Sequence, residues 1–400
     1  MQKGYSLALK QQLWHISKAY TKGYCKECLQ TQSNKMDKRS ENSFDFLRVF
    51  SALMVLLSHS YPLFGLPEPK PIFGITLGSL SVAFFFSISG FLIYQSWIST
   101  QNLLKFFLKR FRRIYPGLIF VSFLTAFILG PLSSTLSWNE YLLSGTAINY
   151  LISVGLSLND QGLLGVFEKN PYPNTVNGSL WTLKYEILMY ATLAFAGVLV
   201  PARHLTPTIV SLLVIFSASW VFISVYELQI SDIKITNKAP FFWRLSVELK
   251  LDRIAYLGAF FFAGSTFSIY KNKIPINGRI TLLLWIILLT LEEKTLAMIC
   301  LWFTVPYTAV YFAYNSPKIF QKINGHDYSY GIYIYAFPIQ QTLSLWAVKN
   351  HFNWITCVSL SILLTLTFSA FSWHFIESPF LRYKNRKTTP GVVCTPPSEV

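Results

Sequence analysis

Long apolar stretches, separated by short polar segments, run through most of this chain. A helix needs about 20 apolar residues to cross the hydrocarbon core of a bilayer, and ten stretches approach that length, although the seventh is short. A further apolar segment, residues 141–158, is rich in Gly and Ser and predicts a re-entrant or interfacial element. The pattern predicts an all-α polytopic membrane protein with about ten transmembrane helices, at residues 44–64, 77–97, 114–132, 180–200, 208–226, 253–270, 279–292, 296–314, 329–349 and 352–376.

The flanking segments are polar, so the predicted transmembrane domain covers residues 44–382. Residues 1–43 form a basic N-terminal extension without an apolar core or a cleavage site, so they are not a signal peptide. Met36 lies just before the first span and is an alternative start. Residues 383–400 form a short C-terminal tail.

Composition and charge agree with a membrane location. Only 13% of the residues are charged and 52% are hydrophobic, whereas soluble domains carry roughly 25% charged residues. The net charge is +16, and with ten crossings 23 of the 34 Lys and Arg residues fall on the side that holds both termini. Positive charge marks the cytoplasmic side, so both termini are predicted to be cytoplasmic. The basic charge is then an orientation signal, and no nucleic-acid partner is expected.

Two ionisable side chains, Arg48 and His59, stand on the first predicted span. They are eleven residues apart, which corresponds to about three turns, so they share one helix face about 16 Å apart along the axis. Small side chains at Ala52 and Val55 lie between them and leave room for a slender anionic ligand. The alternative is that Arg48 snorkels to the headgroups and His59 bonds a neighbouring helix. A histidine deep in a membrane nevertheless favours a functional role.

A basic segment, KRFRRIYPG at residues 109–117, precedes the third predicted span. Arg110 and Arg113 are neighbours on a helix and are able to hold a phosphate through bidentate hydrogen bonds. The alternative is simple anchoring by positive charge on the cytoplasmic side.

An acidic side chain, Glu186, lies about two turns into the fourth predicted span. A short acid cannot snorkel far, so it is expected to face the protein interior. Glu186 and His59 both fall in the outer half, where a carboxylate would orient the imidazole and raise its basicity. A purely structural ion pair is the alternative.

Other candidate sites are weaker. Ser87, Ser89 and Gly90 in the second span predict close helix packing rather than a nucleophile. Cys25 and Cys28 form a CxxC pair, but no second ligand pair follows, so no metal is expected. The sequence carries no signal for an oligomeric state.

The chain resembles the integral-membrane acyltransferase-3 family, bacterial enzymes that O-acylate extracytoplasmic polysaccharides and related glycans. The resemblance covers about residues 43–385 and rests on segments that stand in the family's order. They are FDFLRVFSALMVLLSH, FFFSISGFLI, RFRRIYP, SLWTLKYE, YSYGIYIYAFPIQQ and HFIESPFLR.

The resemblance implies a ten-helix fold in the bacterial inner membrane and acyl transfer from a coenzyme A thioester, usually acetyl-CoA, supplied from the cytoplasm. It implies that His59 is the essential histidine and that Glu186 is the acid of the tryptophan-containing motif. Arg48, Arg110 and Arg113 are implied to handle the donor. One departure is Ala336, where many members of the family carry a histidine. A second is that no esterase-like domain follows the last span, so this protein or a separate partner is expected to complete the transfer.

The sequence therefore predicts a membrane O-acetyltransferase that modifies a sugar hydroxyl of an extracytoplasmic or lipid-linked glycan. The alternative is a proton-coupled transporter or flippase for such a glycan, in which His59 and Glu186 relay protons. Spans interrupted in matching halves would favour transport, and no such internal symmetry is visible.

Overall fold

The computed structural model describes residues 42–72, 74–158, 160, 162–226, 249–323, 325–350 and 353–382. The predicted N-terminal extension and C-terminal tail lie almost wholly outside this part of the chain, as do Cys25 and Cys28. Throughout the described part the regular structure is helical, and only two isolated bridges pair extended backbone. The all-α fold class is confirmed.

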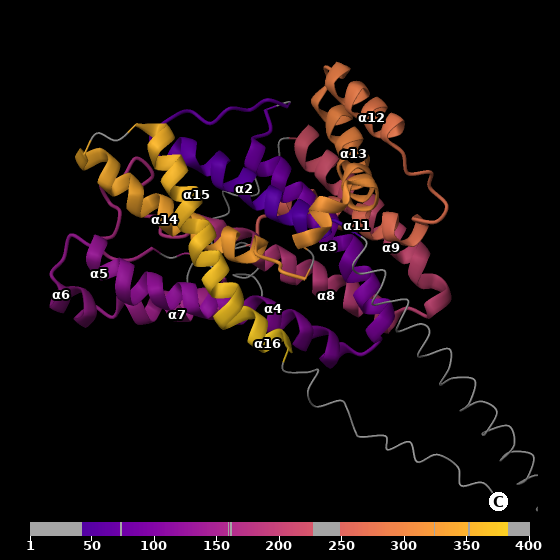
Figure 1. The fold of residues 1–400 in the computed structure, drawn as a ribbon. Coiled ribbons are helices and arrows are strands. Elements are labelled where there is room, and N and C mark those ends of the chain that lie inside the picture. The colour runs from indigo at the N-terminus through magenta and orange to yellow at the C-terminus, as the bar shows by residue number, and fades with distance from the viewer. Residues whose placement is uncertain are drawn as a thin grey trace, which may run out of the picture.

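Helices follow one another along the described part of the chain (Figure 1). A 3-10 turn at Gly178–Thr182 leads into α8, another lies at Lys318–Ile323, and π-helical turns occur at Thr125–Leu129 and Trp373–Glu377. The α-helices are α2 (Phe44–Leu63), α3 (Leu77–Thr100), α4 (Leu103–Leu124), α5 (Gly130–Ser133), α6 (Trp138–Leu143), α7 (Thr146–Ser157), α8 (Leu183–Leu199), α9 (Ala202–Val225), α11 (Leu251–Tyr270), α12 (Gly278–Thr290), α13 (Lys294–Asn315), α14 (Ser329–Asn350), α15 (Trp354–Ser372) and α16 (Ser378–Arg382).

Seven helical segments in the described part are long and apolar enough to cross a membrane. They begin at α2, α3, α4, the turn before α8, α9, α13 and α15. The other three predicted spans are helices too, namely α11, α14 and the 13-residue α12. The protein is thus a multi-pass membrane protein, while ten crossings and the orientation of its termini stay predictions. The segment predicted as re-entrant or interfacial holds α7 and the last residues of α6, and both helices are too short to span.

Helices α3 and α11 cross at very short distance. Built onto Gly90, a Cβ atom would lie 1.8 Å from the carbonyl oxygen of Phe261, and one on Gly264 would lie 2.0 Å from that of Ser87. The Ser265 hydroxyl also donates to the carbonyl of Gly90 at 3.0 Å. Small residues let helix backbones approach closely in membranes. The predicted packing role of Gly90 is confirmed.

Helix α14 packs along α2, and contacts between the two segments run from Arg48 to Leu63. The Gln340 amide donates to the carbonyl of Leu56 at 2.9 Å, and the Ser344 hydroxyl donates to that of Leu63 at 2.7 Å. The connection before α8 packs on the same part of α14, because Gln341 donates to the carbonyls of Tyr172 and Thr175. These bonds fix the segments that surround the predicted site residues.

Candidate functional site

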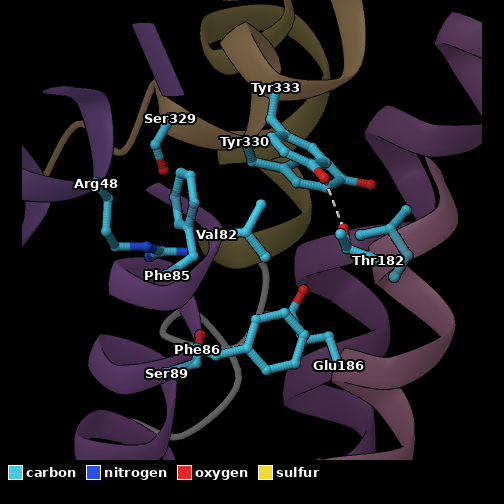
Figure 2. A pocket seen from close by; sticks show the side chains of 11 residues that line it. Arg48, Val82, Phe85, Phe86, Ser89, Thr182, Glu186, Ser329, Tyr330 and Tyr333 are labelled. Atoms are coloured by element: carbon cyan, nitrogen blue, oxygen red, sulfur yellow. Dashed lines mark hydrogen bonds between the residues drawn. The ribbon is translucent and has the colours of Figure 1, made fainter. Parts of the chain in front are cut away.

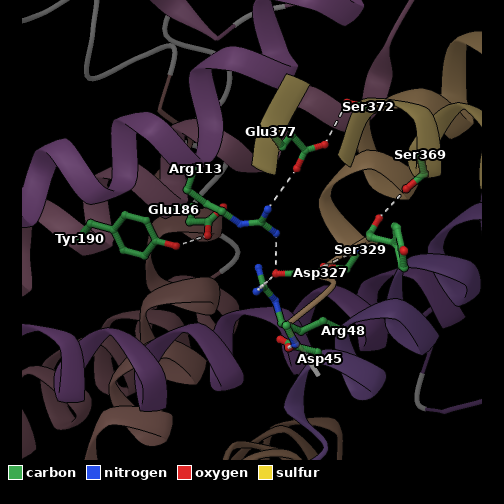
Figure 3. Close-up of polar contacts among 12 residues, drawn as sticks. Asp45, Arg48, Arg113, Glu186, Tyr190, Asp327, Ser329, Ser369, Ser372 and Glu377 are labelled. Atoms are coloured by element: carbon green, nitrogen blue, oxygen red, sulfur yellow. Dashed lines mark hydrogen bonds and ion pairs between the residues drawn. The ribbon is translucent and has the colours of Figure 1, made fainter. Parts of the chain in front are cut away.

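Four charged side chains from separate parts of the sequence form an arginine cluster, defined as Arg48, Arg113, Asp327 and Glu377 (Figure 3). Arg48 of α2 and Arg113 of α4 both pair with Oδ2 of Asp327, in the connection before α14. Arg113 also pairs with Glu377 at 3.1 Å. The four side chains are between 1% and 20% exposed. The structure thus brings two of the predicted donor-handling arginines together, but each already has a carboxylate partner.

A π-helical turn positions Glu377. The turn covers Trp373–Glu377, between α15 and α16, and the hydroxyl of Ser372 donates to Glu377 Oε1 at 3.0 Å. The extra residue of a π-turn changes the direction of the side chains that follow it, and such turns are frequent at functional sites. Here it brings the second carboxylate to Arg113.

Asp327 is held ionised by its surroundings. Burial alone would raise the pKa of its carboxyl group, but Arg113 and Arg48 hold the pKa below its usual value, and hydrogen bonds from Ser329 act in the same direction. The backbone N–H of Ser329 and its hydroxyl both donate to Oδ1. Asp327 is thus an anion that both arginines bind in this conformation.

Arg110 is placed differently from the other two arginines. It donates to the hydroxyl of Ser96 at 2.9 Å, and its guanidinium lies over the rings of Phe106 and Tyr190, at 5.4 and 5.8 Å from their centres. Its Nε atom is buried and has no hydrogen-bond partner among the described residues. One N–H group of Arg110 is therefore buried without an acceptor among the described residues.

A narrow cavity of about 40 Å³ lies next to the arginine cluster, between α2, α3, α8 and α14 (Figure 2). Arg48 and Glu186 line it from different helices, and Thr182 and Tyr333 line it further along, joined by a hydrogen bond of 2.7 Å. A water molecule needs at least about 10–15 Å³. The cavity thus has room for about three waters or a slender chain, and not for a nucleotide.

Glu186 belongs to this cavity and does not contact His59. It accepts a hydrogen bond from the Tyr190 hydroxyl, one turn along α8. The expectation that Glu186 orients the imidazole is not supported by this arrangement. The sequence indicates that both side chains lie in the outer half of the membrane, but a shared depth does not bring them into contact. Ala52 and Val55, the expected lining of a donor channel, are only 1% and 3% exposed, and neither lines the cavity.

His59 packs edge-on against the ring of Phe337 on α14, with ring centres 5.4 Å apart. Its Nδ1 atom is buried and has no hydrogen-bond partner among the described residues. Arg48 pairs with Asp327 just before α14, and His59 contacts Phe337 further along that helix. Both therefore lie on the side of α2 that faces α14, as the eleven-residue spacing predicts.

The sequence patterns did not indicate a role for Asp327, Glu377 or Phe337. Asp327 directly precedes the YSYGIYIYAFPIQQ segment and Glu377 lies within HFIESPFLR, two of the segments that carried the family resemblance. An acidic residue at the end of an apolar helix, in a chain whose other spans carry arginines, is a signal that could have indicated ion pairs for both Asp327 and Glu377. Phe337 gave no signal, because an aromatic side chain in an apolar helix is ordinary. Within the described residues, no group of three or more His, Cys, Asp or Glu side chains could hold a metal ion.

Comparison with known proteins gives two kinds of match. Residues 41–374 match the acyltransferase domain that defines the acyltransferase-3 family. The chain is 31% identical to an O-acetyl transferase of Shigella phage Sf6 over an alignment of 354 positions, which covers 86% of this chain and 98% of the relative. It is 25% identical to nodulation protein 10 of Rhizobium leguminosarum bv. viciae over an alignment of 385 positions, which covers 88% of this chain and 96% of that protein. No solved structure matches with significant similarity.

Proposed function

The chain belongs to the acyltransferase-3 family and is an acyltransferase, and we propose that it transfers an acetyl group from cytoplasmic acetyl-CoA to a sugar hydroxyl. The acceptor in this proposal is an extracytoplasmic or lipid-linked glycan. The enzyme sits in the bacterial inner membrane with both termini in the cytoplasm. The relative from phage Sf6, which matches over nearly its whole length, supports the acetyl group as the one transferred.

The observation that carries the proposal is the placement of Arg48 and His59 along one side of α2. Arg48 belongs to the arginine cluster, and His59 lies about 16 Å further along the axis, against Phe337. This separation suits a ligand with anionic phosphates at one end and a reactive thioester at the other. The arginine cluster binds charge at one end, and His59 offers an imidazole for proton transfer at the other.

The donor phosphates bind at the cluster end in this proposal. Arg110 offers its free Nε–H, while Arg48 and Arg113 exchange part of their contact with Asp327 for the phosphates. Charge-assisted and bidentate bonds of this kind are the strongest that arginine makes. The cavity is too small for the nucleotide, so the nucleotide stays at the surface and the slender arm extends along α2 toward His59.

His59 acts as the general base. It takes the proton from the acceptor hydroxyl, whose oxygen attacks the thioester carbonyl and forms a tetrahedral adduct. The adduct expels the coenzyme A thiolate, which receives the proton from His59, so the products are the acetyl ester and the free thiol. Glu186 lines the cavity together with Arg48. Its role in this mechanism is therefore at the end that binds the donor phosphates, and not in orienting His59.

NMR of the surface polysaccharide from a gene-deletion strain tests this proposal. The strain is complemented with wild type, with His59→Ala or with His204→Ala, a substitution of an exposed histidine at the start of α9. We expect O-acetyl signals with wild type and His204→Ala and none with His59→Ala, at equal membrane levels of the protein. Unchanged acetylation but altered amounts of surface glycan would instead indicate a transporter, and full acetylation with His59→Ala would overturn the mechanism.

A further inference from the structure

Three buried amide side chains, which belong to α14 or bond to it, carry hydrogen-bond acceptors without donors. Within the described part of the chain, the unpartnered atoms include the side-chain oxygens of Asn170, Asn177 and Gln340. These three residues are 5%, 1% and 0% exposed. Buried polar groups are nearly always paired, so an unpaired group needs a specific explanation.

The identity of these orphan atoms is fixed by their partners. The side-chain NH₂ of Asn177 donates to the carbonyl of Ile334 at 2.9 Å, and that of Gln340 donates to the carbonyl of Leu56 at 2.9 Å. The NH₂ of Asn170 donates to the carbonyl of Gln341 at 2.9 Å. A backbone carbonyl only accepts, so in each amide the nitrogen is in use and the orphan atom is the oxygen. All three orphans are acceptors.

The contacts of Phe337 and Gln340 bring the segments that carry Asn177 and Gln340 close to the part of α2 that carries His59. Gly178, which follows Asn177, packs so closely that a Cβ atom on it would lie 2.7 Å from the Phe337 ring. Gln340 is one turn further along α14 and bonds Leu56, which is one turn before His59 on α2. The ring of Tyr172, 42% exposed, lies 6.1 Å from that of Phe337 and marks where this region reaches the surface.

We infer that Asn170, Asn177 and Gln340 form the acceptor subsite, where their amide oxygens receive hydrogen bonds from the hydroxyl groups of a sugar. Three acceptors without donors require a ligand rich in donors, and a sugar ring offers several O–H groups from one rigid body. The subsite lies at the His59 end of α2, away from the arginine cluster, so an attacking hydroxyl is held where the base stands. This inference rests on the proposed function.

A second source of donors is the pantetheine arm of the acyl donor, which carries amide N–H groups. Kinetics with both substrates separate the two sources. The enzyme is reconstituted in liposomes with acetyl-CoA and the unacetylated surface polysaccharide of the deletion strain. Gln340→Met keeps the side-chain length and removes the orphan oxygen. The matched control is Ser344→Ala, which also removes one bond from α14 to a carbonyl of α2 but removes no orphan acceptor.

We expect Gln340→Met to raise KM for the polysaccharide about tenfold, the effect of one hydrogen bond, with KM for acetyl-CoA unchanged. Asn177→Leu should act in the same direction, and Ser344→Ala should leave both constants near wild type. Thermal unfolding of each variant in detergent identifies folded protein, and polysaccharide should raise the midpoint of wild type more than that of Gln340→Met.

Three outcomes overturn the inference. They are an unchanged polysaccharide KM in both folded variants, a rise in KM for acetyl-CoA alone, and an equal effect in Ser344→Ala. In each, the wild type still acetylates the polysaccharide, so the proposed function stands. Absence of transfer by the wild type itself contradicts the proposed function instead.

Discussion

Replacement of Gly90 by alanine tests the close crossing of α3 and α11 that holds the fold together. The new Cβ atom would lie 1.8 Å from the carbonyl oxygen of Phe261, whereas real contacts are not shorter than about 3.0 Å. The helices must therefore separate locally by about 1.2 Å, because the obstacle is backbone and cannot rotate away. Overpacking of this kind costs about 3 kcal/mol, and the better helix propensity of alanine offsets about 1 kcal/mol. We expect a net loss of about 2 kcal/mol.

Thermal unfolding in detergent, followed by circular dichroism, measures this loss against a matched variant. Gly155 lies within α7 and a Cβ atom on it would meet nothing within 4 Å. Gly155→Ala makes the same chemical change without the clash and should leave the midpoint unchanged or raise it. Equal midpoints for Gly90→Ala and Gly155→Ala would refute the close crossing.

Three further predictions concern the charged residues. Asp327→Asn leaves the guanidinium groups of the arginine cluster without their shared carboxylate, so the free energy of unfolding should fall by about 3 kcal/mol. Glu168→Gln, at an exposed position, serves as the control, and an equal unfolding midpoint in both variants would contradict the ion pairs. The folded-state pKa of Asp327 lies below its usual value of 3.8, so the stabilisation that its carboxylate gives is complete above about pH 4 and is lost as the pH falls through that lower pKa. The unfolding midpoint of the wild type should therefore fall more steeply in acid than that of Asp327→Asn. Parallel curves of midpoint against pH would contradict this prediction. Because Glu186 does not contact His59, Glu186→Gln should move the imidazole limb of the pH–rate profile by less than about one unit, and a larger shift would show that the two groups interact.

The sequence predicted the helices better than the site. Each span predicted from apolar length coincides with a helix of the structure. The predicted start of the third span was residue 114, however, whereas α4 begins at Leu103. The basic residues between these positions lower the hydropathy without interrupting the helix. Helical phase correctly placed Arg48 and His59 toward one neighbour, since both belong to one rigid element.

Relations between elements were beyond the sequence. Whether Glu186 meets His59 or Arg48 depends on how α8 is shifted along α2, and periodicity within either helix does not fix that shift. The pairing of Asp327 with two arginines depends on the packing of α14 against α2 and α4. The orphan oxygens of Asn177 and Gln340 were likewise invisible, because an unpaired atom is defined by its surroundings.

In the proposed mechanism His59 is the general base for acetyl transfer from acetyl-CoA to a glycan. The most direct test of this role is the initial rate of radiolabel transfer from acetyl-CoA to the deletion strain's polysaccharide by purified enzyme in liposomes. A general base contributes about 10²–10⁴ in rate, so His59→Ala should lose at least about a hundredfold while His204→Ala keeps the wild-type rate. A wild-type rate for folded His59→Ala would contradict the role of His59 as the general base.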